Sequence, residues 1–265
     1  MEHPRKANYH THTFRCQHAE GTDESYVQAA LSAGYTHLGF SDHAPWPFAS
    51  GYVSTIRMTM EELPGYIKSV HSLQAKYADK LPIYLGLESE YFPRYHDHLL
   101  RLRDMGLEYL ILGHHFTDSE ECTPYVGSFC RTDDGVKQYA DTLCAALETG
   151  LFCCVAHPDL YMRAKGSDFN TVCQKAAEDI ARAAIKAGVP LEFNLLGLSS
   201  ERAGHSRNYP YMPFWEHIRS MDPTVILGVD AHSPQDILDA PLYQDGLSQL
   251  KKLGYSPIQE LTFRW

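Results

Sequence analysis

The chain lacks the segments that usually direct a protein into a membrane or out of the cell. Its N-terminus, MEHPRKANYHTHT, has no apolar stretch of the kind found in signal peptides. The longest apolar runs, residues 109–113 and 151–156, are too short to span a bilayer. Seven cysteines are an odd number in a chain without an export signal, which favours free thiols in a reducing compartment. We therefore expect a cytoplasmic protein with no membrane partner.

Basic residues are also in short supply. Lys and Arg number 23 against 33 Asp and Glu, which gives a formal net charge of −10. An acidic surface repels phosphate backbones, so we expect no nucleic-acid partner, although a local basic pocket can still bind a small phosphate. The chain has no low-complexity tract, no internal repeat and no break in composition. Its 265 residues suffice for one large core, so we expect a single domain over residues 1–265.

Segments with strand and helix character alternate along the chain. The expected strands end near residue 12 and cover residues 36–41, 81–88, 108–113, 152–156, 190–193 and 224–229, with a strand-like stretch at 258–263. The expected helices cover residues 23–33, 60–77, 96–103, 135–149, 169–187, 211–220 and 242–253. This pattern predicts an α/β fold of parallel strands joined by helical crossovers. One closed or nearly closed β/α barrel is the simplest architecture, and an open doubly wound sheet is the competing one.

Histidine is unusually abundant, with 15 residues, and its groups fall at the ends of the expected strands. The groups are, in strand order, His10 and His12, Asp42 and His43, Glu88 and Glu90, His114 and His115, His157, Asn194, and Asp230 with His232. In a β/α barrel the carboxyl ends of all strands meet at one mouth. Residues two apart share a face of a strand, so His10 and His12 can bind together, whereas only one of Asp42 and His43 is expected to be a direct ligand.

A single His-x-His motif often arises by chance, and a buried histidine more often satisfies one hydrogen bond than binds a metal. The succession of strand ends carrying His, Asp or Glu favours a metal site. Imidazole and carboxylate together suit Zn, Fe or Mn rather than Ca or Mg. One ion needs three or four protein ligands, so this many candidates indicate more than one ion, up to about three. Such a cluster would carry a local charge of roughly +3 and attract a phosphate dianion.

The ordered motifs resemble a known family. The segment YHTHTFRCQHAEGTDESYVQAALSAGYTHLGFSDHAP is similar to the start of a PHP (polymerase and histidinol phosphatase) domain of the histidinol-phosphatase type. The segments GLESEY, LGHHF, AHPDL, FNLLG and GVDAHSP are similar to its later motifs, in the same order. The resemblance implies a distorted seven-stranded β/α barrel, three divalent ions of Zn, Fe or Mn, and hydrolysis of phosphomonoesters, with L-histidinol phosphate the best-known substrate.

The resemblance also implies roles for individual residues. The implied metal ligands are His10, His12, His18, His43, Glu88, His115, His157, Asp230 and His232. Glu88 would bridge two ions, and Asp42 would orient a ligand histidine. His18 follows from the resemblance alone, because it lies in a loop that the strand argument does not reach.

The implied mechanism has a hydroxide held between ions attack phosphorus while the ions bind the nonbridging oxygens. Arg163 and Arg207 lie in loops after the expected strands and are candidates to grip the phosphate, with a solvated surface role as the alternative for each. His205 is a candidate to protonate the leaving alkoxide, with metal-bound water as the alternative. The ammonium group of histidinol would suit an acidic or aromatic pocket. Asp159, Glu90 and Trp46 lie near the right loops for such a pocket.

Three other functions compete with this hypothesis. A PHP phosphoesterase acting on nucleotides or another small phosphate ester is the nearest. A metal hydrolase of the amidohydrolase type also begins with His-x-His, but those enzymes usually add a carboxylated lysine and no Lys ends an expected strand here. The third is a noncatalytic metal-storage or regulatory protein, which an absence of turnover on any phosphoester would support.

Overall fold

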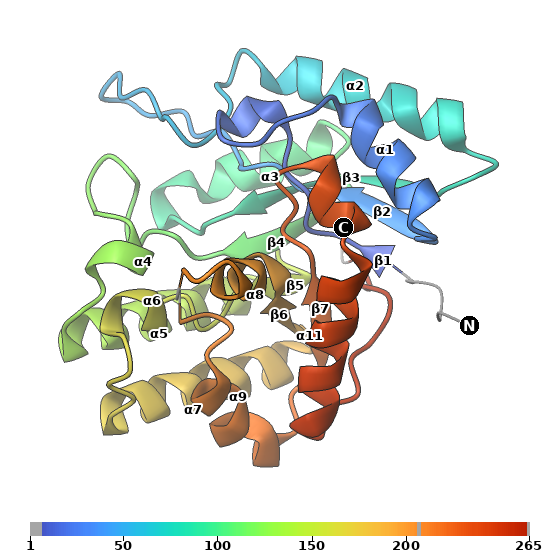
Figure 1. Cartoon of the computed structure of the whole chain (residues 1–265). Helices are drawn as coiled ribbons and strands as arrows, with labels where there is room; N and C mark the ends of the chain where they lie inside the picture. The colour runs from blue at the N-terminus through green and yellow to red at the C-terminus, as the bar shows by residue number, and fades with distance from the viewer. Residues whose placement is uncertain (1–6, 206–207, 264–265) are drawn as a thin grey trace.

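Seven parallel strands form one sheet in which each strand pairs with the next along the chain (Figure 1). The structure is a computed structural model and describes residues 7–205 and 208–263. The strands are β1 (Ala7–Asn8), β2 (His37–Phe40), β3 (Ile83–Ser89), β4 (Tyr109–Gly113), β5 (Cys154–Ala156), β6 (Leu191–Asn194) and β7 (Val225–Gly228). All seven expected strands that precede residue 230 are therefore present, with ends that differ by a few residues.

The two edges of this sheet meet just beyond β1 and β7. His12 N donates to Ala231 O at 2.9 Å, and Ala231 N donates to His10 O at 3.1 Å. Thr11 and Ala231 form a parallel bridge at this point. The sheet is thus a nearly closed barrel, which confirms the predicted fold class and excludes the open doubly wound sheet, in which the strand order would reverse.

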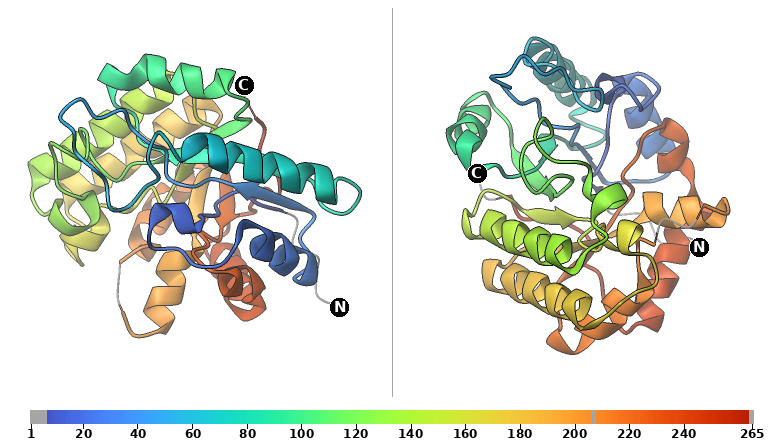
Figure 2. Two further views of the ribbon diagram at one scale, coloured as in Figure 1. Left: turned by 90° about the horizontal axis from the view of Figure 1, so that it is seen from above. Right: turned by 90° about the vertical axis from the view of Figure 1, so that its left-hand side faces the viewer.

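Helices surround the strands, with α1 to α3 on one side and α5, α7 and α11 on the other (Figures 1 and 2). The helices are α1 (Asp23–Ser32), α2 (Leu63–Tyr77), α3 (His96–Asp104), α4 (Val126–Phe129), α5 (Asp133–Glu148), α6 (Met162–Lys165), α7 (Thr171–Ala187), α8 (Leu195–Arg202), α9 (Met212–Ile218), α10 (Pro234–Leu238) and α11 (Ala240–Lys252). Three 3-10 turns, η1 (Phe14–Cys16), η2 (Pro93–Tyr95) and η3 (Arg219–Met221), complete the described elements. The Thr22 side chain accepts from Ser25 N and caps α1, as its sequence position predicts.

The differences from the expected elements lie mainly in the loops. The short helices α4, α6, α8 and α10 occupy segments expected to be irregular, because four to eight residues are too few to show a helical period. The stretch 258–263 is not a strand. Only Ile258 bridges to Ile226 there, and Leu261 and Phe263 pack instead against the inside of the barrel.

The strands bury both faces, but with different partners. Leu110 and Leu112 of β4 join the large core between sheet and helices, whereas Tyr109 and Ile111 join a small cluster inside the barrel. Tyr109 crosses the interior and donates to Tyr9 O at 2.9 Å. A methyl group at Gly39 would lie 2.2 Å from the Tyr109 hydroxyl, so the tyrosine fits only because Gly39 lacks a side chain.

None of the described helices combines the length and apolar character needed to cross a bilayer. The seven cysteines are free thiols. Cys153 and Cys154 are buried in the barrel interior cluster, as small core residues.

Candidate metal centre

His10, His12 and Asp230 bring three ligand atoms together at the mouth of the barrel. The Nε2 atoms of His10 and His12 lie 3.2 Å apart. Asp230 Oδ1 lies 3.3 Å from the first and 3.2 Å from the second. All three side chains are buried, and their backbone follows β1 or β7 where the two edges of the sheet meet. Two imidazole nitrogens this close cannot both carry a proton on the sides that face each other. Both lone pairs can instead point at one cation.

Glu88, at the end of β3, lies in the middle of the cluster. Its Oε2 is 3.0 Å from His43 Nδ1 and 3.4 Å from His12 Nε2. Its Oε1 is 3.0 Å from His157 Nε2 and 3.4 Å from His115 Nε2. His10 Nε2 also lies 3.5 Å from Oε2. Each carboxylate oxygen therefore faces its own set of histidines, which is the geometry of a carboxylate that could bridge two ions.

A third group of ligand atoms lies on the outer side of this cluster. His18, His43 and His232 each offer a nitrogen within 4.8 Å of the others. The ring of His232 stacks on those of His12 and His18, with centroid distances of 4.2 and 4.8 Å. His18 follows the 3-10 turn η1, whose C-cap residue, Gln17, has the left-handed backbone conformation. All nine predicted ligands thus lie in one continuous cluster, although their roles as ligands stay a prediction.

Hydrogen bonds at Nδ1 orient four of these rings. His10 Nδ1 lies 2.8 Å from Glu192 Oε1, and His115 Nδ1 lies 3.1 Å from Glu90 Oε1. His18 and His232 direct Nδ1 to the carbonyls of Cys16 and Asp230, at 2.7 and 3.0 Å. Carboxylates and carbonyls only accept, so the proton belongs on Nδ1 and the Nε2 lone pair is left for a cation.

Asp42 supports the cluster from behind, as expected from the resemblance. It is fully buried, and its carboxylate accepts from the Thr13 hydroxyl. Its Oδ1 accepts from His43 N at 2.8 Å and lies 3.5 Å from His12 Nδ1. Asp42 therefore faces the far side of the His12 ring, whereas His43 enters the cluster, as the alternation along a strand predicts.

The residues present fit divalent metal ions. His43 Nδ1 is buried and faces the cluster beside Glu88 Oε2, and it has no hydrogen-bond partner of normal geometry. A buried polar atom without a partner is costly, so this nitrogen points to a ligand bound within the cluster. Imidazole nitrogens with a few carboxylate oxygens match the preferences of Zn, Fe and Mn.

The charges of the cluster are strongly coupled. Burial alone would lower the pKa of His10, but Asp230, Glu192 and Glu88 outweigh it and raise that pKa well above its usual value. Burial and the neighbouring His12 lower the pKa of His232 to about 3. Burial opposes ionisation of Glu88, yet the histidines around it hold its pKa well below the usual range. The carboxylates therefore remain ionised, as ligands of a cation must be.

Two candidate ligands have an uncommon backbone conformation. His157 and Asp230 have φ of 30° and 52°, in the left-handed region that residues with a Cβ rarely adopt. Each such residue costs on the order of 1–3 kcal/mol, and residues of this kind cluster at functional sites. In both cases the turn directs a side chain from the end of a strand into the mouth.

The cluster forms the floor of a cavity of about 630 Å³. The cavity wall is apolar at Phe116, Leu160 and Leu196, and it carries the cationic side chain of Arg163. The Arg163 guanidinium lies over the Tyr125 ring, 5.5 Å from its centroid, with Nη1 3.4 Å from the Tyr125 hydroxyl. The prediction that Arg163 faces the substrate thus agrees with its position.

Other predicted residues lie elsewhere. His205 is exposed three residues beyond the end of α8 and is not among the described residues that line the cavity, so its role as a general acid stays a prediction without support from its position. Arg207 lies outside the described residues. His114 turns away to Thr142, with Nε2 2.7 Å from the hydroxyl. Asp159, Glu90 and Trp46, considered for binding an ammonium group, are buried and do not line this cavity, so that role also stays a prediction.

Sequence reasoning missed Glu192, Arg57 and Glu120. Glu192 lies two residues before Asn194 on β6, so the same alternation that places Asn194 at the mouth also predicts Glu192 inside the barrel. Arg57 and Glu120 lie in long loops without periodicity, and nothing in the sequence brings them to the site.

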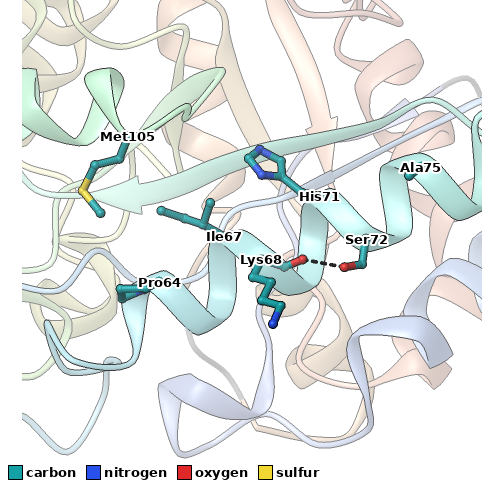
Figure 3. Close-up of a pocket in the computed structure, with 7 residues that line it drawn as sticks. All are labelled: Pro64, Ile67, Lys68, His71, Ser72, Ala75 and Met105. Carbon is teal, nitrogen blue, oxygen red and sulfur yellow. Dashed lines mark hydrogen bonds between the residues drawn. The ribbon is translucent and has the colours of Figure 1, made fainter.

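A second hollow lies along α2, away from the metal centre. Pro64, Ile67, His71 and Met105 contribute to it, and the only hydrogen bond drawn there joins the Ser72 hydroxyl to Lys68 O (Figure 3). It contains none of the described groups that could hold a metal ion.

Comparison with known proteins gives consistent matches. The model of the PHP domain family matches residues 8–195. A Deinococcus radiodurans protein named as a probable histidinol-phosphatase is 29% identical over 96% of this chain and 95% of its own length. The histidinol-phosphatase of Bacillus subtilis is 32% identical over 43% of this chain and 46% of its own length.

A solved structure shares the whole fold. The histidinol phosphate phosphatase of Lactococcus lactis, determined with zinc, L-histidinol and phosphate, superposes with a TM-score of 0.75. The match covers 98% of this chain and all of that one, at 18% sequence identity.

Proposed function

Because the chain belongs to the PHP domain family, we propose that it is a metal-dependent phosphomonoester hydrolase that acts on L-histidinol phosphate. One observation carries the proposal: His and Asp side chains that follow β1, β2, β4, β5 and β7 converge around Glu88 of β3. The near full-length similarity to a protein named as a probable histidinol-phosphatase supports the substrate.

The proposed metal ligands are those expected from the resemblance, with Glu88 shared between ions. Divalent ions bound there would supply Lewis-acid stabilisation of phosphate oxygens and acidify a bound water. The chain's own part is to keep Glu88 and Asp230 ionised and to aim the Nε2 atoms of His10 and His115 inward. About three ions per chain is the number implied by the resemblance, and the five overlapping groups of ligand atoms among the described residues can accommodate more than one ion.

Arg163 is the proposed phosphate-binding side chain. It is the described cation on the cavity wall, and a guanidinium can bind two phosphate oxygens at once. Tyr125 holds it in place through the ring contact and the hydroxyl. Phe116, Leu160 and Leu196 add apolar surface to the wall, which lowers the local dielectric constant and strengthens charge interactions beside it.

The proposal is tested by phosphate release after metal loading. We expect release from L-histidinol phosphate to exceed release from mononucleotides at equal concentration, and to disappear in His10→Ala. Comparable or faster release from nucleotides would favour the nucleotide phosphoesterase instead. Full metal binding without release from any phosphoester would favour a storage or regulatory role.

A further inference from the structure

A buried arginine lies behind the metal centre. Arg57 belongs to the long loop between β2 and α2, yet its side chain is only 1% exposed. Removing a guanidinium from water costs several kcal/mol unless carboxylates or carbonyls receive its N–H groups. The groups that receive the N–H donors of Arg57 therefore indicate why it is buried.

Arg57 forms a forked ion pair with Glu90. Its Nη2 donates to Glu90 Oε1 at 2.9 Å, and its Nη1 donates to Glu90 Oε2 at 3.2 Å. Nη1 also donates to Ala44 O at 2.9 Å, and Nε donates to Glu120 Oε2 at 2.7 Å. The guanidinium thus connects Glu120 in the cavity wall with Glu90 behind the metal ligands.

Glu90 in turn faces a proposed metal ligand. It is fully buried, Trp46 Nε1 donates to its Oε2 at 3.1 Å, and His115 Nδ1 lies 3.1 Å from its Oε1. On the other side of the same ring, His115 Nε2 lies 3.4 Å from Glu88 Oε1. The His115 ring is therefore held between one carboxylate behind it and another at the centre of the cluster.

We propose that Arg57 and Glu90 are positioning residues that fix the orientation and tautomer of His115. The inference rests on the proposed function only in taking His115 as a metal ligand. Glu90 accepts the Nδ1 proton and leaves Nε2 free to bind, and Arg57 clamps both oxygens of Glu90 so that the acceptor cannot rotate away. Nothing in this role requires either side chain to touch the substrate.

The equivalent support for His10 has a different chemistry. Glu192 accepts from His10 at Oε1, and its Oε2 accepts from His157 N at 3.1 Å and from Asn194 Nδ2 at 3.0 Å. Neutral amides therefore hold the carboxylate behind His10, whereas a buried cation holds the one behind His115. Loss of Arg57 should consequently disturb the His115 side of the cluster and leave the His10 side unchanged.

Cobalt titration of metal-free protein tests the proposal without turnover. In Arg57→Met and Glu90→Gln we expect one bound Co²⁺ equivalent to lose about 10- to 100-fold in affinity and to change its visible absorption, since loss of such supporting groups typically costs this much. The other equivalents should bind as in the wild type. Arg57→Lys, which keeps the charge without the fork, should lie between. Arg94→Met is the matched control, because Arg94 forms an exposed ion pair with Asp118 and should leave every equivalent unchanged.

A measurement on the unaltered chain covers the case in which both variants unfold. Nitrogen NMR of the zinc-loaded protein should show His115 protonated at Nδ1, and a ring protonated at Nε2 would overturn the proposal. Wild-type affinity for every equivalent in folded Arg57→Met and Glu90→Gln would overturn it as well. If the protein hydrolyses no phosphoester but the variants lose metal affinity as expected, the positioning role of Arg57 and Glu90 is still supported. The positioning role and the proposed function can therefore fail independently.

Discussion

The two ends of the barrel interior are built from the same strands but filled in opposite ways. At the amino end, Tyr9, Tyr84, Tyr109 and Phe263 form an aromatic cluster, with the Tyr109 and Phe263 rings stacked at 5.0 Å. At the carboxyl end, imidazoles and carboxylates fill the interior, and their nitrogen and oxygen atoms form overlapping groups that could hold metal ions. One end is filled by aromatic packing, with the Tyr109 hydroxyl bonded to backbone carbonyls, whereas the other presents ligand atoms that suit cations.

Glycines mark both ends of this interior. Gly39 leaves room for the Tyr109 hydroxyl, and Gly113 leaves room for Glu88, whose Oε1 would lie 2.1 Å from an added methyl group. Gly228 does the same for Glu192 at 1.6 Å. The comparison teaches that the amino end determines stability, whereas the carboxyl end is arranged for binding, so mutations at the two ends should affect different measurements.

The largest expected effect is at the mouth. Asp230→Ala should lower phosphate release by about 10³-fold or more, because it removes a ligand oxygen shared by His10 and His12. Metal content, measured by elemental analysis, should fall with it. Activity within a few fold of the wild type would contradict the site.

A matched pair of glycine substitutions separates the two ends. Gly113→Ala should displace Glu88 and remove at least one bound ion, while Gly39→Ala should overpack Tyr109 and lower the free energy of unfolding by about 1–3 kcal/mol. Metal content and urea unfolding are measured on both variants. If both lose metal equally and unfold equally, the distinction between the two ends fails.

Within the mouth, Arg163→Met should separate substrate binding from metal binding. Loss of a charged hydrogen-bond donor to phosphate should lower kcat/KM by about 10- to 100-fold. Bound metal should stay at the wild-type level, because Arg163 lies on the wall and is not among the groups that could hold an ion. An Arg163→Met protein with normal kinetics would show that the phosphate is bound by another side chain.

The smallest effect concerns Asp159, behind the mouth. Burial raises the pKa of Asp159 from 3.8 to about 6, while its Oδ2 accepts from Tyr211 N at 2.6 Å and Trp215 Nε1 at 3.0 Å. Because its pKa is higher in the folded state, the folded protein binds this proton more tightly. Stability from this group is therefore full below about pH 4 and is lost as the pH rises towards 6.

Asp159→Asn keeps an oxygen for both donors and cannot ionise. In the metal-free protein it should raise the free energy of unfolding at pH 8 by on the order of 1–3 kcal/mol, with little change at pH 4. Urea unfolding at the two pH values measures this. An equal change in the free energy of unfolding at pH 4 and pH 8 would mean that ionisation of Asp159 does not destabilise the folded protein.

The fold and most of the site could be predicted from local sequence. Strand–helix alternation and the ordered motifs indicate the barrel, and the position of His43 after β2 or His157 after β5 follows from where the strands end. Sequence periodicity predicts the positions of residues in helices and strands, but not of residues in loops. Arg57 and Glu120 come from loops, and their ion pair depends on how two such loops fold over each other.

Two expectations do not match the positions observed. His205 follows β6 in the sequence, but α8 lies between them and His205 is exposed. The stretch 258–263 has strand composition because its apolar side chains pack against the amino end of the barrel, where Phe263 meets Tyr109, without joining the sheet. For residues 258–263 the apolar composition reports burial correctly, whereas the partner of these side chains is decided by tertiary structure.

The most direct test follows phosphate release from L-histidinol phosphate as zinc or manganese is added in steps to metal-free protein. The account predicts no release without metal and a rise that levels off at about three equivalents per chain. Full activity in the metal-free protein, or a plateau reached with a single equivalent, would contradict it.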